Sequence, residues 1–473
     1  MKMNNLPYNK NDKYSIIKYA KKLINKSLRE VCKEELFENE KNKGGFGQLL
    51  EKYYFFYEPN SDNSADFKEV GLELKTSPIK KLKRQDYVSK ERLVLNIINY
   101  IEIVKQDFEN SSFLIKNKNL LLIFYFYEIE KKAIDFKIDI VDEWEFSEID
   151  LEIIKKDWNT IYQKIKAGKA HELSEGDTLY LGACTKGSKG GNLREQPYNK
   201  ILAKQRAFSL KQGYVNHIIA TLSGESKSNY GKLIPSLEIA KDKSLEDIVL
   251  EKFKKYYIKS IDEIQEKLKI SLNKKSKNFY SNLTKAILGI ELENEIEEFK
   301  KAGIIIKTVR LKENSLPKED ISFPAFKFED IVKEKWENSE FKNTLEQKFL
   351  FIFFKYDINQ DLKLEKIKFW NMPQSDIKKV REMWLKTKCI IKNGDIVKEI
   401  IFDKNENEKR ITNFPSKKFS DIAHVRPHAQ NSSDTHVLPK LDKFTKSKEY
   451  TKQSFWLNAS YVRDNIYLEG KKN

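Results

Sequence analysis

The sequence predicts an α/β protein built from two diverged copies of one domain fold. Segments with apolar residues at helical spacing alternate with short apolar runs that are typical of buried strands. The string at residues 66–76 returns in diverged form at residues 298–308, with a constant offset between the two. This period is far too long for a solenoid repeat, so it indicates duplication of a whole domain.

The elements of the first copy can be predicted in chain order. Residues 13–42 and 46–57 have the spacing of helices, and Val70–Lys75 alternates as a short strand. Ser77 and Pro78 are expected to close that strand. Further along, residues 120–127 are predicted as a buried strand and residues 150–165 as an amphipathic helix.

Two further features support the duplication and give the domain boundaries. Arg206–Leu210 is echoed by Ser454–Leu457, and a tryptophan precedes this string in each half, Trp158 in the first and Trp384 in the second. A polar stretch with turn-forming glycines and a proline lies between the halves. The predicted organisation is a first domain at residues 1–222, a linker at residues 223–244 and a second domain at residues 245–473.

The composition favours a polyanionic partner. The 473-residue chain has a formal net charge of +17 and a pI near 9.2. Nucleic acid is the commonest partner for such a balance. An anionic membrane surface is the alternative partner, and the lysine-rich usage of an AT-rich genome would give a similar charge without any partner.

The sequence also excludes several classes of protein. It has no apolar stretch long enough to cross a membrane, and its N-terminus lacks the apolar core of a secretory signal. Cys32, Cys184 and Cys389 lie far apart and predict neither a disulfide framework nor a zinc site. We therefore expect no membrane partner and a reducing, cytoplasmic compartment.

Asp66, Glu73 and Lys75 are the candidate catalytic residues. Phosphodiester hydrolysis uses a hard cation held by carboxylates, and a nearby positive charge that orients or deprotonates the attacking water. Glu73 and Lys75 are two apart, so they share one face of a strand, and the carbonyl of Leu74 can add a metal ligand. Gly71 is expected to allow a tight approach. Spacing alone also fits a surface ion pair, because charged residues are 34% of the chain.

The surroundings of these residues strengthen the catalytic interpretation. Glu51 lies on an otherwise apolar helix, where a carboxylate is costly unless it has a partner or faces a cleft. The basic run Lys80, Lys81, Lys83 and Arg84 follows the candidate site and can lie along DNA phosphates, although a solvated turn would have the same composition.

Taken together, these residues resemble the MutH branch of the PD-(D/E)xK nucleases. Longer strings further along the chain resemble the GATC-cleaving Sau-type restriction endonucleases, and this resemblance covers nearly the whole chain. The strings that carry it are Lys43-Gly44, Gly47–Glu51, Asp66-Phe67, Gly71, Glu73–Thr76, Pro78, Lys90–Tyr100, His171–Gly176, Cys184–Gly187 and Ala203–Lys211.

The resemblance implies a fold, a cofactor and a reaction. The fold is a mixed sheet flanked by helices, and the second domain is a degenerate copy. Asp66 and Glu73 would hold Mg²⁺, Lys75 would be the catalytic lysine and Glu51 a supporting carboxylate. A further lysine on the next strand falls on Lys116, with Lys118 as the alternative. The implied reaction is double-strand cleavage 5′ of the G in GATC, leaving 5′-phosphates, at a site shared with a methyltransferase that is not stably bound.

Several residues of the first half are candidate DNA contacts. The family's methyl-sensing tyrosine is replaced by Ser209, so we do not expect a preference for hemimethylated DNA. A small serine leaves room for an N6-methyl group, and we hypothesise that cleavage tolerates adenine methylation. Any single lysine among the candidates can equally be a solvated surface charge. The candidate contacts are Lys43, Lys186, Lys204, Arg206, Ser209 and Lys211.

The second half is predicted to be catalytically silent. Glu298, Ile305 and Lys307 stand where the first half has its trio, and an isoleucine cannot bind a metal ion. Lys285 loosely replaces Glu51. Arg426 lies in a string like the family's recognition string and suits a bidentate contact to guanine, or it merely pairs with a surface carboxylate.

Arg426 and Asn458 are the candidate DNA contacts of this second half. The resemblance implies a type IIE enzyme, in which the second domain binds another copy of the site and activates the first. A scaffold domain is the alternative role. For the whole chain, a MutH-like repair nicking enzyme and a non-catalytic sequence-specific DNA-binding protein are the alternatives to a restriction endonuclease.

Overall fold

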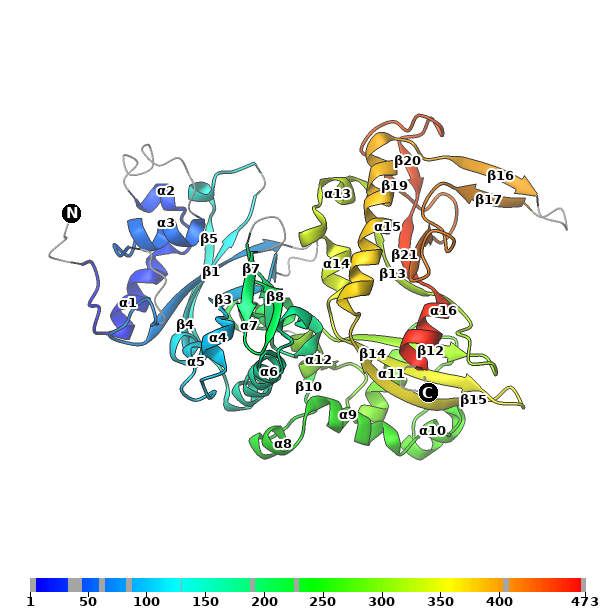
Figure 1. The fold of residues 1–473 in the computed structure, drawn as a ribbon, viewed down its shortest axis with the longest axis horizontal. Helices are drawn as coiled ribbons and strands as arrows, with labels where there is room; N and C mark the ends of the chain where they lie inside the picture. The colour runs from blue at the N-terminus through cyan, green and yellow to red at the C-terminus, as the bar shows by residue number, and fades with distance from the viewer. Residues whose placement is uncertain are drawn as a thin grey trace. The chain divides into compact units, whose positions relative to one another are not determined.

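The computed structural model describes residues 6–32, 45–58, 64–81, 87–128, 130–187, 192–224, 229–402 and 408–468. Contacts divide the chain into two compact units, residues 1–248 with 290–303 and residues 249–289 with 304–473. Both units mix helices with sheets, as the sequence predicts (Figure 1). The stretch predicted as a linker contains strand β10 (Tyr230–Gly231) and helix α8 (Leu237–Asp242).

The central sheet of the first unit has the strand order β2-β1-β4-β5. Strand β1 is parallel to β4, pairing Glu73 with Leu120, and β4 is antiparallel to β5, so the sheet is mixed as expected. Helix α3 packs on β1 through a core that includes Leu50 and Leu74. The strands are β1 (Leu72–Lys81), β2 (Tyr87–Ser89), β4 (Asn119–Phe126) and β5 (Ile138–Glu145).

A second, antiparallel sheet of this unit has the order β3-β9-β6, and β7 and β8 form a hairpin. The long helix α6 buries Trp158. The strands are β3 (Leu93–Ile97), β6 (Leu181–Thr185), β7 (Leu193–Gln196), β8 (Asn199–Lys204), β9 (Arg206–Leu210) and β11 (Glu295–Ile296). The helices are α1 (Lys13–Ala20), α2 (Leu28–Val31), α3 (Phe46–Tyr53), α4 (Tyr100–Ile103), α5 (Ser112–Asn117), α6 (Glu148–Lys166), α7 (Gln212–Leu222) and α12 (Glu297–Ala302).

The second unit repeats both sheets. Its order β12-β14-β15 has the same parallel and antiparallel pairings as β1-β4-β5, and β13-β21-β18 matches β3-β9-β6. Helix α15 lies beside the latter sheet and buries Trp384, as α6 buries Trp158 (Figure 1). This shared topology confirms that one fold occurs twice.

The elements of the second half have the following bounds. The helices are α9 (Leu245–Lys254), α10 (Ile261–Leu268), α11 (Phe279–Leu288), α13 (Phe328–Lys333), α14 (Glu340–Leu345), α15 (Gln374–Asn393) and α16 (Ala459–Tyr461). The strands are β12 (Ile305–Leu311), β13 (Ile321–Phe326), β14 (Phe349–Tyr356), β15 (Leu362–Trp370), β16 (Lys398–Phe402), β17 (Glu408–Thr412), β18 (Ala423–Pro427), β19 (Thr435–Val437), β20 (Glu449–Thr451) and β21 (Gln453–Leu457).

The helical prediction for residues 13–42 holds in separate pieces over the described residues, with a break at Asn25, which adopts a left-handed conformation between α1 and α2. Two local predictions were wrong. Strand β1 continues through Pro78 to Lys81: Pro78 pairs with Tyr125 of β4, and its carbonyl accepts a 2.9 Å hydrogen bond from the amide of Lys90, next to β2. Gly71 makes no close approach; it supplies a turn with φ of +61°.

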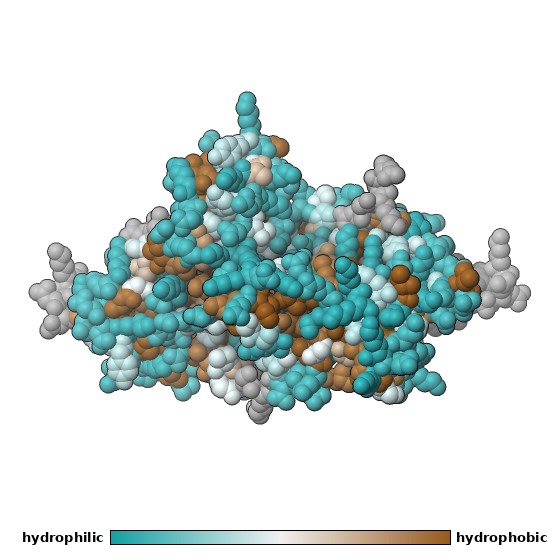
Figure 2. Space-filling view, turned by 90° about the horizontal axis from the view of Figure 1, so that it is seen from below, coloured by the Kyte–Doolittle hydropathy of each residue, from teal (hydrophilic) through white to brown (hydrophobic). Residues whose placement is uncertain are grey.

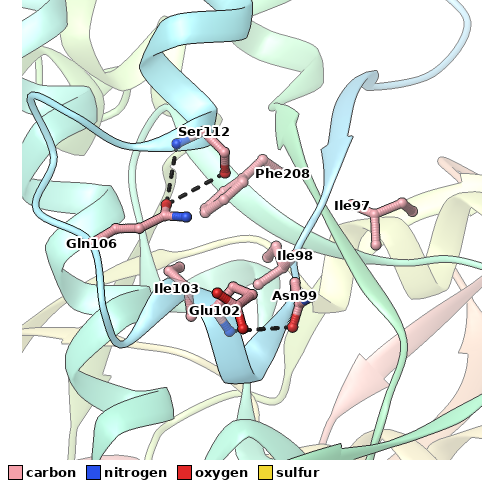
Figure 3. Close-up of a pocket in the computed structure, with 8 residues that line it drawn as sticks. All are labelled: Ile97, Ile98, Asn99, Glu102, Ile103, Gln106, Ser112 and Phe208. Atoms are coloured by element: carbon pink, nitrogen blue, oxygen red, sulfur yellow. Dashed lines mark hydrogen bonds between the residues drawn. The ribbon is translucent and has the colours of Figure 1, made fainter. Parts of the chain in front are cut away.

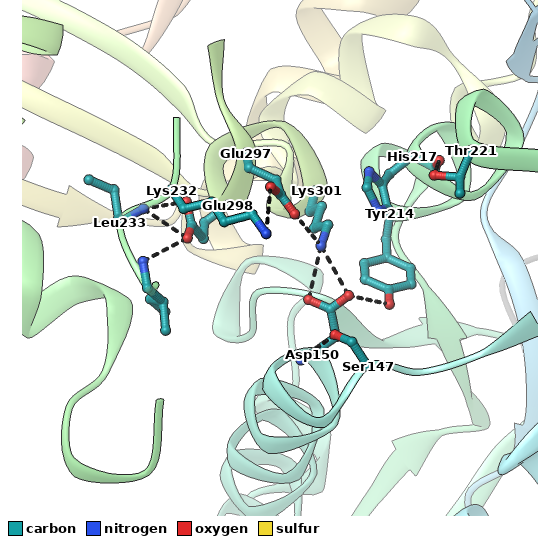
Figure 4. Close-up of polar contacts among 11 residues, drawn as sticks. Ser147, Asp150, Tyr214, His217, Thr221, Lys232, Leu233, Glu297, Glu298 and Lys301 are labelled. Carbon is teal, nitrogen blue, oxygen red and sulfur yellow. Dashed lines mark hydrogen bonds and ion pairs between the residues drawn. The ribbon is translucent and has the colours of Figure 1, made fainter. Parts of the chain in front are cut away.

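A buried charge network fixes α12 within the first unit (Figure 4). The Nζ of Lys301 lies 3.0 Å from both carboxylate oxygens of Asp150 and 2.7 Å from Oε1 of Glu297. The hydroxyl of Tyr214 on α7 donates to the same Asp150 over 2.9 Å. Burial lowers the pKa of Lys301, but the two carboxylates outweigh it and raise that pKa above its ordinary value.

The surface, the helices and the cysteines each bear on how the protein can function. Figure 2 shows a face on which hydrophilic residues predominate and hydrophobic ones form scattered patches. Of the helices in the described part of the chain, none has the length and apolar character needed to cross a membrane. Cys32, Cys184 and Cys389 are free cysteines.

Candidate active site

Residues from two helices, from strand β1 and from the turn before β1 lie close together in the first unit. Glu73 and Lys75 lie on β1, Asp66 precedes that strand, and Glu51 lies on α3. Lys116 lies in the last turn of α5 and not on a strand, which corrects the expectation, because β4 begins only at Asn119. Its Nζ is nevertheless 3.7 Å from Oε1 of Glu73.

A tight loop brings Asp66 beside β1. Phe67 and Leu72 exchange backbone hydrogen bonds of 2.9 and 3.2 Å, closing the loop around the left-handed Gly71. The amide of Asp66 then donates to Oε2 of Glu73 over 3.0 Å, and the amide of Leu74 donates to Oδ2 of Asp66 over 3.0 Å. The two carboxylates are therefore held by main-chain donors as well as by their own rotamers.

Burial dominates the electrostatics of the carboxylates. The side chain of Glu73 is 1% exposed, and burial raises its pKa to about 7 against the lowering effect of Lys75. Burial, followed by the charge of Asp66, raises the pKa of Glu51 to about 7 as well. Lys75 forms an ion pair with Oε1 of Glu73. Three carboxylates thus lie near two lysines, and their negative charge is only partly compensated.

The arrangement is suited to a cation. No cluster of three His, Cys, Asp or Glu side chains ready to bind a metal is found in the described ranges. Mg²⁺ does not need one, because it binds through one or two carboxylates and keeps water and phosphate ligands. The desolvated Glu73 and Glu51 favour an added positive charge. The buried hydroxyl of Tyr57, which follows α3, makes no hydrogen bond to any described residue; burial raises its pKa, and the charges of the same carboxylates raise that pKa further.

Comparison with known proteins agrees with this fold. The family model of the DNA mismatch repair enzyme MutH matches twice, at residues 55–157 and 288–387, once in each half. The chain is therefore a two-copy MutH-like endonuclease with the PD-(D/E)xK fold.

Similarity to a whole enzyme narrows the class. The chain is 40% identical to the type II restriction enzyme Sau3AI of Staphylococcus aureus, over 96% of this chain and 98% of that enzyme. It thus belongs to the MutH/Sau-type family of type II restriction endonucleases, which are site-specific deoxyribonucleases that bind double-stranded DNA.

The predicted DNA contacts of the first half differ in exposure. Lys204 is exposed and Lys186 is half-buried, whereas Lys43 lies outside the described residues. The Nζ of Lys211 donates to the carbonyl of Thr178. Lys83 and Arg84, from the basic run that follows the candidate site, also fall outside the described residues.

Arg206 and Ser209 do not face solvent in this structure, unlike the contacts expected of them. The guanidinium of Arg206 is buried and donates to the carbonyls of Ala183 and Leu173. Ser209 is also fully buried. The small size of Ser209 therefore does not explain how the enzyme would accommodate a methylated adenine. The structure does not support the hypothesis that cleavage tolerates adenine methylation.

The second half lacks the catalytic arrangement. Ile305 begins β12 where β1 has Glu73. Glu298 accepts hydrogen bonds from the amides of Leu233 and Ile234 at 2.9 and 2.8 Å. The Nζ of Lys307 donates to the carbonyl of Ser322 over 2.7 Å, and burial lowers its pKa to about 8. Both former catalytic positions have structural partners, and Lys285 lies on α11.

Arg426 and Asn458 have different environments. Arg426 is exposed and its Nη1 lies 3.3 Å from Oδ2 of Asp320. Asn458 is buried: its Oδ1 accepts from Nδ1 of His424 at 2.7 Å and its Nδ2 donates to the carbonyl of Ser420 at 2.9 Å. Asn458 therefore supports the strand that carries Arg426.

Sequence reasoning missed Tyr57 and Asp320. Tyr57 stands in a run of aromatic residues, where no pattern separates a core tyrosine from one beside carboxylates. Asp320 lies in an acidic turn that has no special spacing. A small pocket of about 80 Å³ was also missed; it is lined by residues of α4, α5 and β9 and by none of the predicted catalytic residues (Figure 3).

Proposed function

We propose that this restriction endonuclease makes Mg²⁺-dependent double-strand cuts 5′ of the G in GATC and leaves 5′-phosphates. Asp66, Glu73 and Lys75 form its catalytic centre, with Glu51 and Lys116 as supporting groups. The observation that carries this proposal is the convergence of these three carboxylates and two lysines in the first unit. The resemblance to Sau-type enzymes supports the GATC site.

The protein groups divide the chemistry among them. When bound, Mg²⁺ would polarise the scissile phosphate and make a water more acidic. Asp66 and Glu73 would hold it, together with the carbonyl of Leu74. Lys75, on the same face of β1 as Glu73, orients the attacking water and offsets the charge that develops on the phosphate. Lys116 adds a second positive charge on the Glu73 side of the site.

Substitution of the trio tests the catalytic assignment. Asp66→Ala and Lys75→Ala should each reduce cleavage by a factor of about 10² to 10⁴, the usual contribution of such a group. Lys105→Ala is the control, since Lys105 is exposed and pairs with Glu102. In Ca²⁺, Lys75→Ala should still bind DNA. Cleavage by either variant at the rate of the control would refute the assignment.

Product analysis tests the reaction type. On supercoiled plasmid with two sites, a restriction endonuclease yields linear fragments. Accumulation of nicked circles only would favour the MutH-like repair alternative, and binding without any cleavage in Mg²⁺ would favour the non-catalytic alternative. The cognate methyltransferase is expected to share the site without forming a stable complex.

We further propose that the second half binds another copy of the site and activates the first. Support comes from Ile305 in place of the metal-binding Glu73, combined with an exposed Arg426 on β18. Two-site DNA should then be cut faster than one-site DNA, and an added GATC duplex should stimulate one-site cleavage. Equal rates on both substrates, unaffected by the duplex, would leave a scaffold as the role of this half.

A further inference from the structure

A buried carboxylate organises the surface around Arg426 in the second unit. The side chain of Asp320, directly before β13, is only 5% exposed. Its Oδ1 lies 2.7 Å from Nζ of Lys417 and accepts a 2.9 Å hydrogen bond from the amide of Ala459. Its Oδ2 lies 3.3 Å from Nη1 of Arg426 and 3.8 Å from Nε2 of His424. Three donors, from Lys417, Arg426 and the amide of Ala459, thus meet on one carboxylate.

The guanidinium of Arg426 contacts Trp456 and Asp320, and the remainder of the side chain is exposed to solvent. Its guanidinium carbon lies 3.8 Å from the centre of the Trp456 ring, a stacked cation–π contact. One nitrogen faces Asp320, yet the side chain remains 44% exposed. An arginine fixed in this way loses little side-chain freedom when its remaining donors bind a partner. A surface ion pair between two mobile side chains would not have this geometry.

The strand registers allow a comparison with the first half. Leu457 of β21 pairs with Ile321 and Ala423, as Leu210 of β9 pairs with Leu93 and Leu181. Counting from these pairs, Asp320 corresponds to Arg92, Arg426 to Cys184 and Trp456 to Ser209.

The charges at these matching positions are reversed. In the first half Arg92, before β3, pairs with the carboxylate of Glu175, whereas in the second half the carboxylate precedes the strand and the arginine lies on the neighbouring one. Cys184 and Ser209 are buried, so the first half has no exposed group at the places of Arg426 and Trp456. The two halves therefore present different chemistry on the same sheet.

We propose that Asp320 is a positioning residue of the second half's DNA site, which orients Arg426 against Trp456 so that its open donors meet a guanine edge. Lys417, on the other oxygen of Asp320, lies where it can meet a backbone phosphate. Bidentate contact between arginine and guanine is the commonest specific contact in the major groove and depends on a fixed guanidinium plane. This inference rests on the proposed role of the second half as an effector domain.

The test measures activation of the full-length enzyme. One-site DNA is cut in the presence of increasing GATC duplex, and each variant is normalised to its own rate without duplex. Asp320→Asn should raise the duplex concentration for half-maximal activation about tenfold. It should also reduce discrimination against a duplex whose guanine is replaced, a readout that a merely structural role would not change. Glu319→Gln is the matched control, because Glu319 is the exposed neighbour and pairs with Arg310.

Two arginine variants separate the possible failures. Arg426→Lys keeps the charge at an exposed position but not the planar fork, so it should lose discrimination as Asp320→Asn does, even where Asp320→Asn is poorly folded. Arg426→Ala should abolish activation. If the wild type itself is not activated by the duplex, the effector proposal fails. If the wild type is activated and Arg426→Ala is activated to the same extent, the roles of Arg426 and Asp320 are both overturned, although the effector role stands. If Arg426→Ala is not activated but Asp320→Asn and Arg426→Lys discriminate like the wild type, the role of Asp320 is overturned and the effector role stands.

Discussion

Replacement of Lys301 by methionine should destabilise the first unit strongly. The Lys301 side chain is 6% exposed and lies between the buried carboxylates of Asp150 and Glu297. Methionine keeps the apolar stem but removes the charge. Two carboxylates then remain in a desolvated site, where the Tyr214 hydroxyl still donates to Asp150. Breaking a buried ion pair from one side costs about 3–5 kcal/mol.

The neighbouring lysine provides the control. Lys300 is 57% exposed and its Nζ lies 2.8 Å from Glu295, so the charge is the same but solvent screens it. Lys300→Met should cost about 0–1 kcal/mol. For a unit of this size, the 3–5 kcal/mol expected for Lys301→Met corresponds to a fall in Tm of about 6–20 °C.

Thermal unfolding of the two variants, followed by circular dichroism, measures this difference. The first transition of Lys301→Met should move to lower temperature, and that of Lys300→Met should stay near the wild-type value. Equal Tm values for the two variants would refute the reasoning that the buried network holds α12 in the first unit.

Three further predictions concern the first half. The pKa values of Glu51 and Glu73 are about 7 in the folded protein, against an ordinary value of 4.5. Between pH 4.5 and 7 the metal-free folded protein therefore binds more protons than the unfolded chain, so its free energy of unfolding should fall as the pH rises through this range. Ca²⁺ affinity, measured by calorimetry, should rise from pH 6 to 8 for the same reason, and a flat profile would count against it. Arg206→Ala should lower Tm far more than Arg194→Ala, an exposed neighbour bonded to Gln205; equal values would argue against a structural Arg206. Lys116→Ala should slow cleavage about 10–100-fold without weakening DNA binding in Ca²⁺, and an unchanged rate would remove Lys116 from the site.

Much of the fold follows from local sequence. The duplicated string predicts two copies because its residues form the same turn and strand in each half. Gly71 and Gly303 both adopt left-handed conformations in that turn. Trp158 and Trp384 mark the long helices because a large apolar side chain at helical spacing is best buried.

Other features depend on contacts between distant segments. The sequence cannot show that Arg206 turns inward, because its acceptors are carbonyls more than twenty residues away. It places Lys116 on a strand, while the structure has it at a helix end whose position only tertiary packing fixes. Asp320 gains its role from Lys417, Arg426 and the amide of Ala459, which meet only in the folded chain.

The position of the cut ends tests the central claim most directly. Sequenced DNA is digested in Mg²⁺ with the wild type and with Asp66→Asn, and every new end is mapped. We predict that wild-type ends lie 5′ of the G in GATC, carry 5′-phosphates, and are absent from the Asp66→Asn digest. Ends at another sequence would contradict the assigned site, and the same ends from Asp66→Asn would contradict the catalytic role of the first half.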